Sequence, residues 1–338
     1  MKALVYTAPR RVEIQDLPQP AVHPNDCLVR IRAAGVCGSD LDGFLGRSKK
    51  RVPPLVLGHE FSGEIAQTGS AVTDLRVGDT VAVYPLVTCG ECVYCRTRRH
   101  QICPNRKVYG LDFHGALAEY VSAPRDCLFP LPAAMGFLEG ALVEPLANAI
   151  HVMSRCPAPA GATGLVYGAG PIGLFVYLVA RHLGAKRLAV VDVNPHRLRL
   201  LATLGADLTV NASEQDPVET LRGWAGGYGF DFAVDAVGRA VCRENCLALT
   251  APGGANIWIG FGDDRAEVDG RVIITREIEI KGSYAYGLED FAQAITLLGQ
   301  KAIPVDKFVV ETTLDKGQAI FEDLASGHSS LMKAVFRI

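Results

Sequence analysis

Apolar and polar residues alternate along several short segments in the first 150 residues of the chain. In the clearest of them Cys27, Val29, Ile31 and Ala33 would share one face, and two arginines would lie on the other. A period of two is typical of a half-buried β-strand. Glycines and prolines separate further short strands, which we expect at residues 2–6, 12–15, 61–66, 80–84 and 117–121. This punctuation predicts a compact, barrel-like β domain.

The period changes after Thr163, where apolar strands begin to alternate with helical segments. We expect strands at residues 165–167, 187–192, 208–211, 230–235, 255–259 and 278–284. The pairs Asn194-Pro195 and Asp216-Pro217 each place a capping side chain before proline, which is typical of a helix start. Six strands that alternate with helices or crossovers predict a doubly wound parallel sheet.

The C-terminal segment returns to the character of the first part. We expect a helix at residues 290–298, a strand at 308–310, a helix near 317–325 and a final strand at 333–338. A chain of 338 residues is longer than one core usually serves. The sequence therefore predicts a sheet domain, residues 151–289, inserted into a domain made of residues 1–150 and 290–338.

Composition and charge narrow the classes of function. The formal net charge is −2, and both signs are interspersed, so there is no general electrostatic reason to bind nucleic acid or an anionic membrane. The N-terminus has no apolar run long enough for a signal peptide, and no run of about 18 apolar residues follows. We therefore expect a cytoplasmic protein without a membrane span.

Four cysteines, Cys89, Cys92, Cys95 and Cys103, lie within one short stretch. Two successive C-x-x-C steps bring three thiolates around one point, and the fourth can complete a tetrahedron. A four-cysteine set without an open position is typical of structural zinc. The alternative is disulfide bonding, which requires an oxidising compartment. Without a secretion signal, the stretch predicts one structural Zn²⁺.

The segment GAGPIG at residues 168–173 follows a predicted buried strand and opens a predicted helix. In this context Gly168 permits the tight turn, Gly170 lets a diphosphate approach the backbone, and Gly173 lets the helix pack on the strand. Pro171 and Ile172 lie in the first turn of the helix, whose N–H groups and partial positive charge favour an anion. The segment predicts a dinucleotide site.

Asp192 ends the next predicted strand, 19 positions after Gly173. A carboxylate there can accept hydrogen bonds from ribose hydroxyls and would repel a 2′-phosphate, which favours NAD over NADP. The alternative for Asp192 is a loop or helix-capping aspartate. Arg197 on the following helix is also a candidate cofactor residue, because it can bind a phosphate or stack on adenine; a solvated side chain is its alternative.

Further candidate metal ligands lie far apart in the sequence: Cys37, His59, Glu60 and Glu144. Three protein ligands with one open position are what a catalytic zinc needs. Each residue also has a purely structural explanation, as a buried thiol, a core histidine or a first-turn acid of a helix. Spacing alone cannot join them.

The chain resembles the zinc-dependent medium-chain alcohol and polyol dehydrogenase family over essentially its whole length. The resemblance is carried, in family order, by GVCGSD at 35–40, GHEFSGEI at 58–65, VGDTVAV at 77–83, the four-cysteine loop, GALAEYV at 115–121, EPLANAIH at 144–151 and the glycine turn followed by VVDVNP. It implies an α/β protein with a GroES-like catalytic domain and an inserted Rossmann domain, and two Zn²⁺ per chain with NAD as the cofactor.

By position, the resemblance implies that Cys37, His59 and Glu144 bind the catalytic zinc. Glu60 would be an outer carboxylate, or a ligand that exchanges with water. Asp40 would accept the other ring N–H of His59 and so fix its orientation. The Glu-Pro-Leu form around Glu144 is similar to the polyol and sugar-alcohol branch. The expected reaction transfers a hydride from a secondary hydroxyl of a polyol or sugar derivative to NAD.

The chain departs from the family pattern at two places. Ser39 would take the alcohol proton, but Asp42 stands where many members carry a histidine that continues the relay. The relay would then run through Asp42, through water or through the cofactor ribose. Ala285 stands where sorbitol-type enzymes carry an arginine that reaches the substrate, which argues against ordinary sorbitol specificity. The basic loop at residues 47–51 can attract an anionic group such as a polyol phosphate, although we favour a solvated loop.

Other interpretations remain. Oxidation of an amino alcohol of the threonine type is the nearest alternative, and a polyol phosphate is another possible substrate. A non-catalytic NAD- and zinc-binding protein is disfavoured because the candidate ligands are all retained. A nucleic-acid binder is disfavoured by the charge. The resemblance also implies a homodimer or homotetramer, in which segments 255–261 and 278–284 would pair sheets across a twofold axis.

Overall fold

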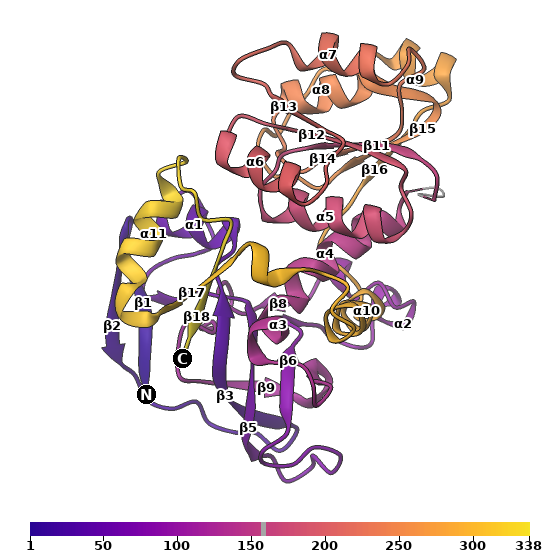
Figure 1. The fold of residues 1–338 in the computed structure, drawn as a ribbon. Coiled ribbons are helices and arrows are strands. Elements are labelled where there is room, and N and C mark those ends of the chain that lie inside the picture. Colours follow the sequence, from indigo (N-terminus) through magenta and orange to yellow (C-terminus); the bar gives the residue numbers. More distant parts are fainter. Residues whose placement is uncertain (157–159) are drawn as a thin grey trace. The chain divides into compact units, whose positions relative to one another are not determined.

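The middle of the chain, Asn148–Tyr286, forms a unit of its own, and the segments on either side, Met1–Ala147 and Gly287–Ile338, together form the other. We refer to these as the central unit and the flanking unit. The computed structural model describes residues 1–156 and 160–338. Figure 1 shows the path of the chain, from indigo at the N-terminus to yellow at the C-terminus.

The flanking unit is built mainly from antiparallel strands. Its largest sheet has the order β10 (Leu128–Pro130), β6 (Thr80–Val83), β5 (Glu60–Thr68), β3 (Asp26–Gly35), β18 (Lys333–Arg337) and β17 (Val309–Thr313), with β9 (Tyr120–Pro124) also paired to β3. Smaller sheets are formed by β2 (Arg11–Asp16), β1 (Lys2–Ala8) and β4 (Leu55–Val56), and by β7 (Leu86–Val87) and β8 (Lys107–Val108).

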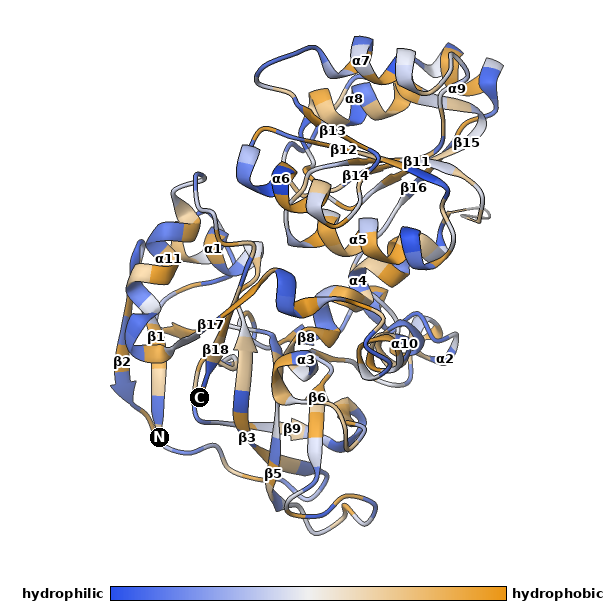
Figure 2. Cartoon of the chain, in the orientation of Figure 1, coloured by the Kyte–Doolittle hydropathy of each residue, from blue (hydrophilic) through white to orange (hydrophobic). Residues whose placement is uncertain are grey.

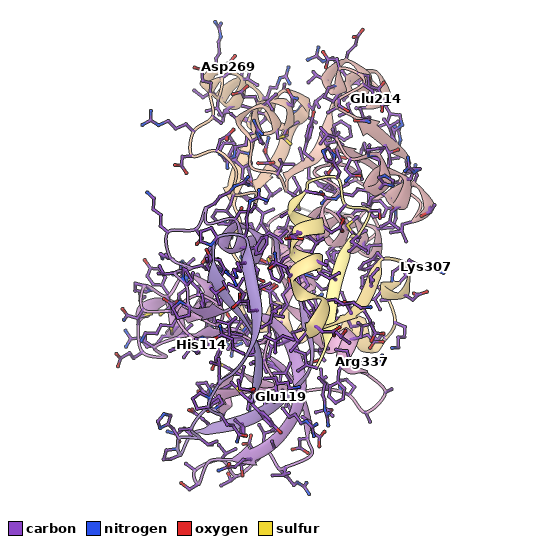
Figure 3. The ribbon with its side chains drawn as sticks, turned by 90° about the vertical axis from the view of Figure 1, so that its left-hand side faces the viewer. His114, Glu119, Glu214, Asp269, Lys307 and Arg337 are labelled. Atoms are coloured by element: carbon purple, nitrogen blue, oxygen red, sulfur yellow. The ribbon has the colours of Figure 1, made fainter. Side chains whose placement is uncertain are left out.

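The C-terminal strand is integral to the flanking sheet. β18 lies between β3, to which it is antiparallel, and β17, to which it is parallel. Val335 is paired with Gly35 at the end of β3, so the last residues of the chain lie beside its first third (Figure 1). Arg337 of this strand lies at the surface (labelled in Figure 3). It pairs with Glu311 at 2.6 Å.

Short helices complete the flanking unit. They are α1 (Gly38–Phe44), α2 (Val93–Arg96), α3 (Phe137–Ala141), α10 (Leu288–Gly299) and α11 (Gly317–Ala325), and α4 (Val143–Ser154) begins in this unit. Phe44 of α1 and Phe321 of α11 are fully buried, and their ring centroids lie 5.2 Å apart. Aromatic packing therefore holds α11, near the C-terminus, against the helix that follows β3.

The central unit is a parallel sheet with the order β13 (Leu208–Asn211), β12 (Arg187–Asp192), β11 (Thr163–Tyr167), β14 (Phe230–Asp235), β15 (Thr250–Trp258) and β16 (Glu279–Gly282). Its helices are α5 (Pro171–His182), α6 (Pro195–Thr203), α7 (Pro217–Trp224), α8 (Ala240–Leu249) and α9 (Gly270–Arg276). The inner strands are apolar because both of their faces are covered (Figure 2). The predicted doubly wound parallel sheet is confirmed.

One predicted strand is displaced along the chain. The strand expected at 117–121 forms three residues later, as β9, Tyr120–Pro124. The backbone of Leu117 is already engaged, since it accepts from Leu4 N–H at 2.7 Å and donates to Leu57 at 3.0 Å. The register with β3 runs from Tyr120, opposite Arg30, to Pro124, opposite Asp26. Within residues 1–156 and 160–338, no helix is both long enough and apolar enough to cross a membrane.

Candidate active site and metal centres

The four cysteines of the loop at residues 89–103 point at one another. The Sγ separations are 3.5 Å for Cys89–Cys103 and for Cys92–Cys95, 3.8 Å for Cys92–Cys103 and 3.9 Å for Cys89–Cys95. Sulfurs at tetrahedral corners around zinc, with Zn–S of about 2.3 Å, lie about 3.8 Å apart. All ten cysteines of the chain are free, so no disulfide explains the cluster. The donor set fits a structural zinc site.

Local backbone geometry prepares this loop for an ion. Cys92 caps α2, and its Sγ accepts from Cys95 N–H at 3.5 Å. The backbone N–H groups of Cys92 and Glu91 lower the pKa of the Cys89 thiol to about 6. Burial instead raises the pKa of Cys95 to about 11. Zinc ligation requires the thiolate form, so the N–H donors favour zinc binding at Cys89. At Cys95 a bound cation would itself have to stabilise the thiolate.

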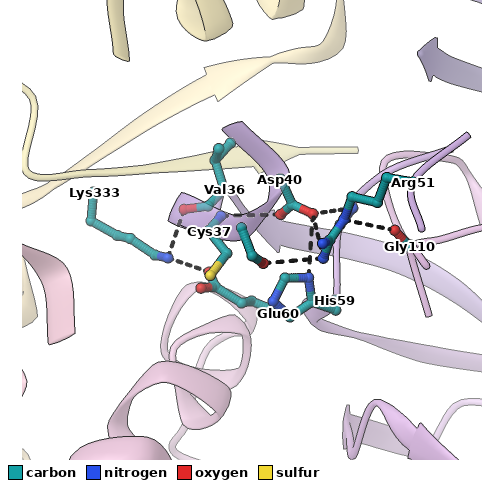
Figure 4. A network of polar contacts seen from close by, with 10 residues as sticks. Val36, Cys37, Asp40, Arg51, His59, Glu60, Gly110 and Lys333 are labelled. Atoms are coloured by element: carbon teal, nitrogen blue, oxygen red, sulfur yellow. Dashed lines mark hydrogen bonds and ion pairs between the residues drawn. The ribbon is translucent and has the colours of Figure 1, made fainter. Parts of the chain in front are cut away.

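Strand pairing assembles a second group of ligands in the flanking unit. Glu60, the first residue of β5, is paired with Gly35 at the end of β3, so His59 and Glu60 lie beside Cys37 at the start of α1. Ligand atoms of Cys37, His59 and Glu60 all lie within 4.8 Å of one another (Figure 4). Gly35 leaves the space for this carboxylate, because a Cβ on it would lie 2.1 Å from Glu60 Oε2.

A fully buried carboxylate orients the histidine of this group. Asp40 Oδ1 lies 3.3 Å from His59 Nδ1, and Asp40 Oδ2 accepts from Cys37 N–H at 3.1 Å. Burial alone would raise the pKa of Asp40, but the opposing effects of His59, Arg51 and the Cys37 N–H are larger and lower it to about 2. Burial would lower the pKa of His59, but Asp40 and Cys37 outweigh it and raise it well above the ordinary value. Because Asp40 engages Nδ1, Nε2 is left for a metal.

Sequence reasoning missed Arg51, which it placed in a solvated basic loop. Its side chain is 9% exposed and lies against the first turn of α1. The guanidinium donates to Ser39 Oγ at 3.1 Å and to the Gly110 carbonyl at 3.1 Å, and it lies 3.7 Å from Asp40 Oδ1 (Figure 4). The only local signal for this burial is Gly43 in α1. A Cβ at Gly43 would lie 2.5 Å from the Cδ of Arg51.

Sequence reasoning also missed Lys333, the first residue of β18. Its ammonium contacts the Glu60 carboxylate and donates to the Val36 carbonyl at 2.9 Å, on the opposite side of the group from Arg51 (Figure 4). Lysine is almost never this deeply buried unless it is paired. One oxygen of Glu60 is therefore committed to an ammonium.

The remaining predicted residues are placed as follows. Ser39 is half-buried in the first turn of α1, while Asp42 is exposed, and its backbone carbonyl accepts from Arg47 N–H at 2.9 Å. Glu144 is 7% exposed in the first turn of α4. Among the described residues, the group within 4.8 Å consists of Cys37, His59 and Glu60 and does not include Glu144.

The glycine turn of the central unit has the geometry that its spacing predicts. It follows the inner strand β11, Gly168 adopts a φ of +98°, and Gly170 caps α5 with Pro171 and Ile172 in the first turn. A Cβ at Gly173 would lie 1.7 Å from the Gly168 carbonyl oxygen, so only glycine allows this approach of helix and turn.

Asp192, at the end of β12, holds the turn in place. Its carboxylate accepts from Ala169 N–H at 2.6 Å and from Asn194 N–H at 2.8 Å. Each oxygen keeps a second lone pair with which it can accept another hydrogen bond. Arg197 also faces the turn, because its Nη1 would lie 3.7 Å from a Cβ at Gly170. Its Nε is buried and has no hydrogen-bond partner among the residues that the structure describes. This pair can receive the hydroxyl and phosphate groups of a nucleotide.

Comparison with known proteins identifies both units. Residues 23–133 match the family model of the alcohol dehydrogenase GroES-like domain, and residues 171–300 match that of the zinc-binding dehydrogenases. An L-threonine 3-dehydrogenase from Bacillus velezensis is 34% identical over 278 residues, covering 81% of this chain and 79% of that protein. A sorbitol dehydrogenase from Bacillus subtilis is 33% identical over 326 residues, covering 93% and 92%.

A solved structure agrees over the whole chain. It is that of a Sinorhizobium meliloti 1021 protein of the zinc-binding dehydrogenase type bound to NADP, with a TM-score of 0.92 and 29% identity. The match covers 100% of this chain and 99% of that one. The expected combination of a GroES-like domain with a Rossmann sheet is confirmed.

Proposed function

Because the chain belongs to the zinc-binding alcohol dehydrogenase family, we propose that it oxidises a secondary hydroxyl of a polyol or sugar-alcohol derivative with NAD as the acceptor. The observation that carries this proposal is the group of Cys37, His59 and Glu60, in which His59 and Glu60 are buried and Cys37 is half-buried, with Asp40 beside the histidine. Sulfur, imidazole and carboxylate are the donor types of catalytic zinc sites. We assign catalysis to the flanking unit and dinucleotide binding to the central unit.

We assign the catalytic zinc to Cys37, His59 and Glu144, with Glu60 or water at the remaining position. Charge supports this assignment. Asp40 faces Arg51 and Glu60 faces Lys333, so each pair is close to neutral. A Cys37 thiolate and a Glu144 carboxylate would bring two negative charges to Zn²⁺. The cysteines of the loop at residues 89–103 would hold the second, structural zinc.

Each side chain of the active site has a proposed task. Zinc bound there would supply the Lewis acidity that makes a substrate hydroxyl easier to deprotonate. Ser39 would accept the hydroxyl proton, and Asp40 would keep the His59 ring in its metal-facing orientation. Asp42 is exposed, so the proton would pass from Ser39 to the cofactor ribose or to water, or onward to Asp42 at the surface.

The central unit would bind the cofactor through the glycine turn. The N–H groups at the start of α5, around Pro171 and Ile172, would receive the diphosphate. Asp192 would accept hydrogen bonds from the adenosine ribose, which favours NAD. NADP is the alternative, because the Sinorhizobium meliloti relative was solved with it and Arg197 offers a cation beside the turn.

Two relatives frame the substrate class. The sorbitol dehydrogenase supports a polyol, and the threonine dehydrogenase supports an amino alcohol as the second candidate. Ala285 in place of a substrate-binding arginine argues for a polyol derivative other than sorbitol itself. A polyol phosphate remains a variant of the first candidate, because Arg47, Lys49 and Lys50 are exposed on the loop after α1.

We further propose a homodimer or homotetramer in the cytoplasm. β16 is the edge strand of the parallel sheet, and Phe261 and Ile274 in the same unit are 80% and 77% exposed. An open edge beside exposed apolar side chains favours pairing with a second copy. The ten free cysteines fit a reducing compartment. Light scattering of the purified protein would measure its mass in solution.

A substrate panel tests the function. The zinc-loaded chain is incubated with NAD and, separately, with sorbitol, xylitol, their phosphates, threonine and ethanol, and NADH absorbance is followed. We expect the highest kcat/KM with a polyol or polyol phosphate. Preference for threonine would favour the second candidate, and no NADH from any of these compounds would contradict the proposal.

A further inference from the structure

The guanidinium of Arg51 makes several polar contacts beside the proposed metal ligands. It joins three segments, because it donates to Ser39 Oγ in α1 and to the Gly110 carbonyl, and lies 3.7 Å from Asp40 Oδ1. It is 9% exposed, although its neighbours in the loop, Lys49 and Lys50, are exposed. Burying a charge is costly unless it is paired, so we expect this guanidinium to have a role in the site.

The chain makes room for this side chain. Arg51 N–H donates to Ser48 Oγ at 3.3 Å, which holds the backbone from which the side chain departs. Gly43 leaves the space for the stem, since a Cβ there would lie 2.5 Å from the Cδ of Arg51. Gly43 in α1 and Ser48 in the loop that follows therefore both help to place the guanidinium of Arg51.

The contact with Ser39 restricts what the hydroxyl can do. A hydroxyl has one donor and two acceptor lone pairs, whereas a guanidinium has only donors. Arg51 therefore occupies one lone pair of Ser39 Oγ and turns the hydroxyl hydrogen away from itself. The second lone pair is left in a defined direction, and a fixed positive charge lies next to it. A proton acceptor needs this kind of prior orientation.

Resting on the function proposed above, we propose that Arg51 is a positioning residue for the oxidation: its guanidinium fixes the Ser39 hydroxyl and the Asp40 carboxylate in a single arrangement. Asp42, at the position of the family's relay histidine, is exposed and does not take this place. The orientation of the proton acceptor thus comes from a loop residue 12 positions after Ser39.

Four variants test the assignment on the zinc-loaded, full-length protein. Arg51→Met removes the donors and keeps the stem, and Arg51→Lys keeps the charge without the planar fork. Gly43→Ala keeps Arg51 but occupies the space of its stem. Arg76→Met is the matched control, an exposed arginine of the flanking unit outside the proposed site. Each is assayed for kcat and KM with the best polyol of the panel, for the primary deuterium isotope effect, for its unfolding temperature and for zinc release to 4-(2-pyridylazo)resorcinol.

We expect Arg51→Met to lower kcat by about 10- to 100-fold with little change in KM, and Arg51→Lys to restore only part of it. The isotope effect should rise, and one of the two zincs should leave faster. Gly43→Ala should lower kcat because its Cβ would displace the stem of Arg51, and the higher helix propensity of alanine should offset part of the steric cost in the unfolding temperature. Arg76→Met should behave as the wild type. If Arg51→Met does not fold, Gly43→Ala decides the question.

A kcat within about twofold of the wild type in Arg51→Met and Gly43→Ala, with unchanged zinc release, would overturn the assignment. The outcome is separable from the failure of the proposed function. If the wild-type chain oxidises nothing in the panel, the function fails, and zinc release alone decides on Arg51. Faster zinc release from Arg51→Met than from Arg76→Met would then support the contact of Arg51 with Asp40, and equal release would overturn it.

Discussion

Lys333 and Glu60 form a buried ion pair across 273 positions of sequence, and each side chain is only 1% exposed. The same ammonium donates to the carbonyl of Val36, the residue before Cys37. One cation therefore holds the start of β5 and the start of α1 together, next to the proposed zinc ligands (Figure 4). The last strand of the chain is thus part of the framework of the active site.

Removing Lys333 should be costly. In Lys333→Met, Glu60 keeps its burial but loses its cation, and we expect a loss of about 3–5 kcal/mol in the free energy of unfolding. Urea denaturation of the zinc-loaded protein measures it. Lys307→Met is the matched control, since its pair with Asp306 is exposed and should contribute less than about 1 kcal/mol. Equal losses in the two variants would show that the buried pair has no special role.

The cysteine loop should hold a zinc independently of the active site. Cys103→Ser removes a fully buried ligand of the cluster, and we expect one zinc per chain to be lost, with a lower unfolding temperature. Cys242→Ser, on α8 of the central unit, is the control and should keep both ions. Elemental analysis of the two variants makes the comparison. Full zinc content in Cys103→Ser would exclude the tetrahedral assignment.

Asp192 should set the preference between cofactors. Asp192→Ser shortens the side chain and removes the charge that would repel a 2′-phosphate, so the ratio of kcat/KM for NAD to that for NADP should fall by about tenfold or more. The substitution will also lower kcat/KM for both cofactors, because Asp192 accepts from Ala169 N–H in the glycine turn. A loss shared by NAD and NADP does not change the ratio. An unaltered ratio would refute the role of this carboxylate.

Zinc binding at the active site should weaken as the pH falls. The pKa of His59 is raised in the metal-free protein, chiefly by Asp40, so below that pKa zinc must displace a proton from the ring. Affinity should then drop by at least about tenfold for each pH unit. Competition with a chelator at several pH values measures the slope. Asp40→Asn, which removes the main cause of the raised pKa, should flatten it around neutral pH, and an equally steep slope in that variant would contradict this account.

Local patterns predicted the fold well, and they failed where contacts are remote. Strands Arg187–Asp192 and Phe230–Asp235 have the predicted bounds, because burial on both faces leaves a continuous apolar run. The cysteine cluster could also be predicted, because its four cysteines lie within residues 89–103. The strand expected at 117–121 was misplaced because backbone partners elsewhere in the chain engage Leu117.

The partners of the metal group could not be read from spacing. Arg51 lies in a charged run that has the composition of a solvated loop, and its burial depends on the space left by Gly43. Lys333 meets Glu60 only because β18 lies beside β3 in the folded sheet. Glu144 was proposed from resemblance, and its place in the zinc shell is still a prediction.

The central claim is that Cys37 belongs to a zinc site separate from the cysteine loop and needed for oxidation. Zinc content per chain, measured for the wild type and for Cys37→Ala with NADH formation from the best polyol in parallel, tests it most directly. We expect two zincs in the wild type, one in Cys37→Ala, and no NADH from the variant. Two zincs in Cys37→Ala together with undiminished turnover would contradict the account.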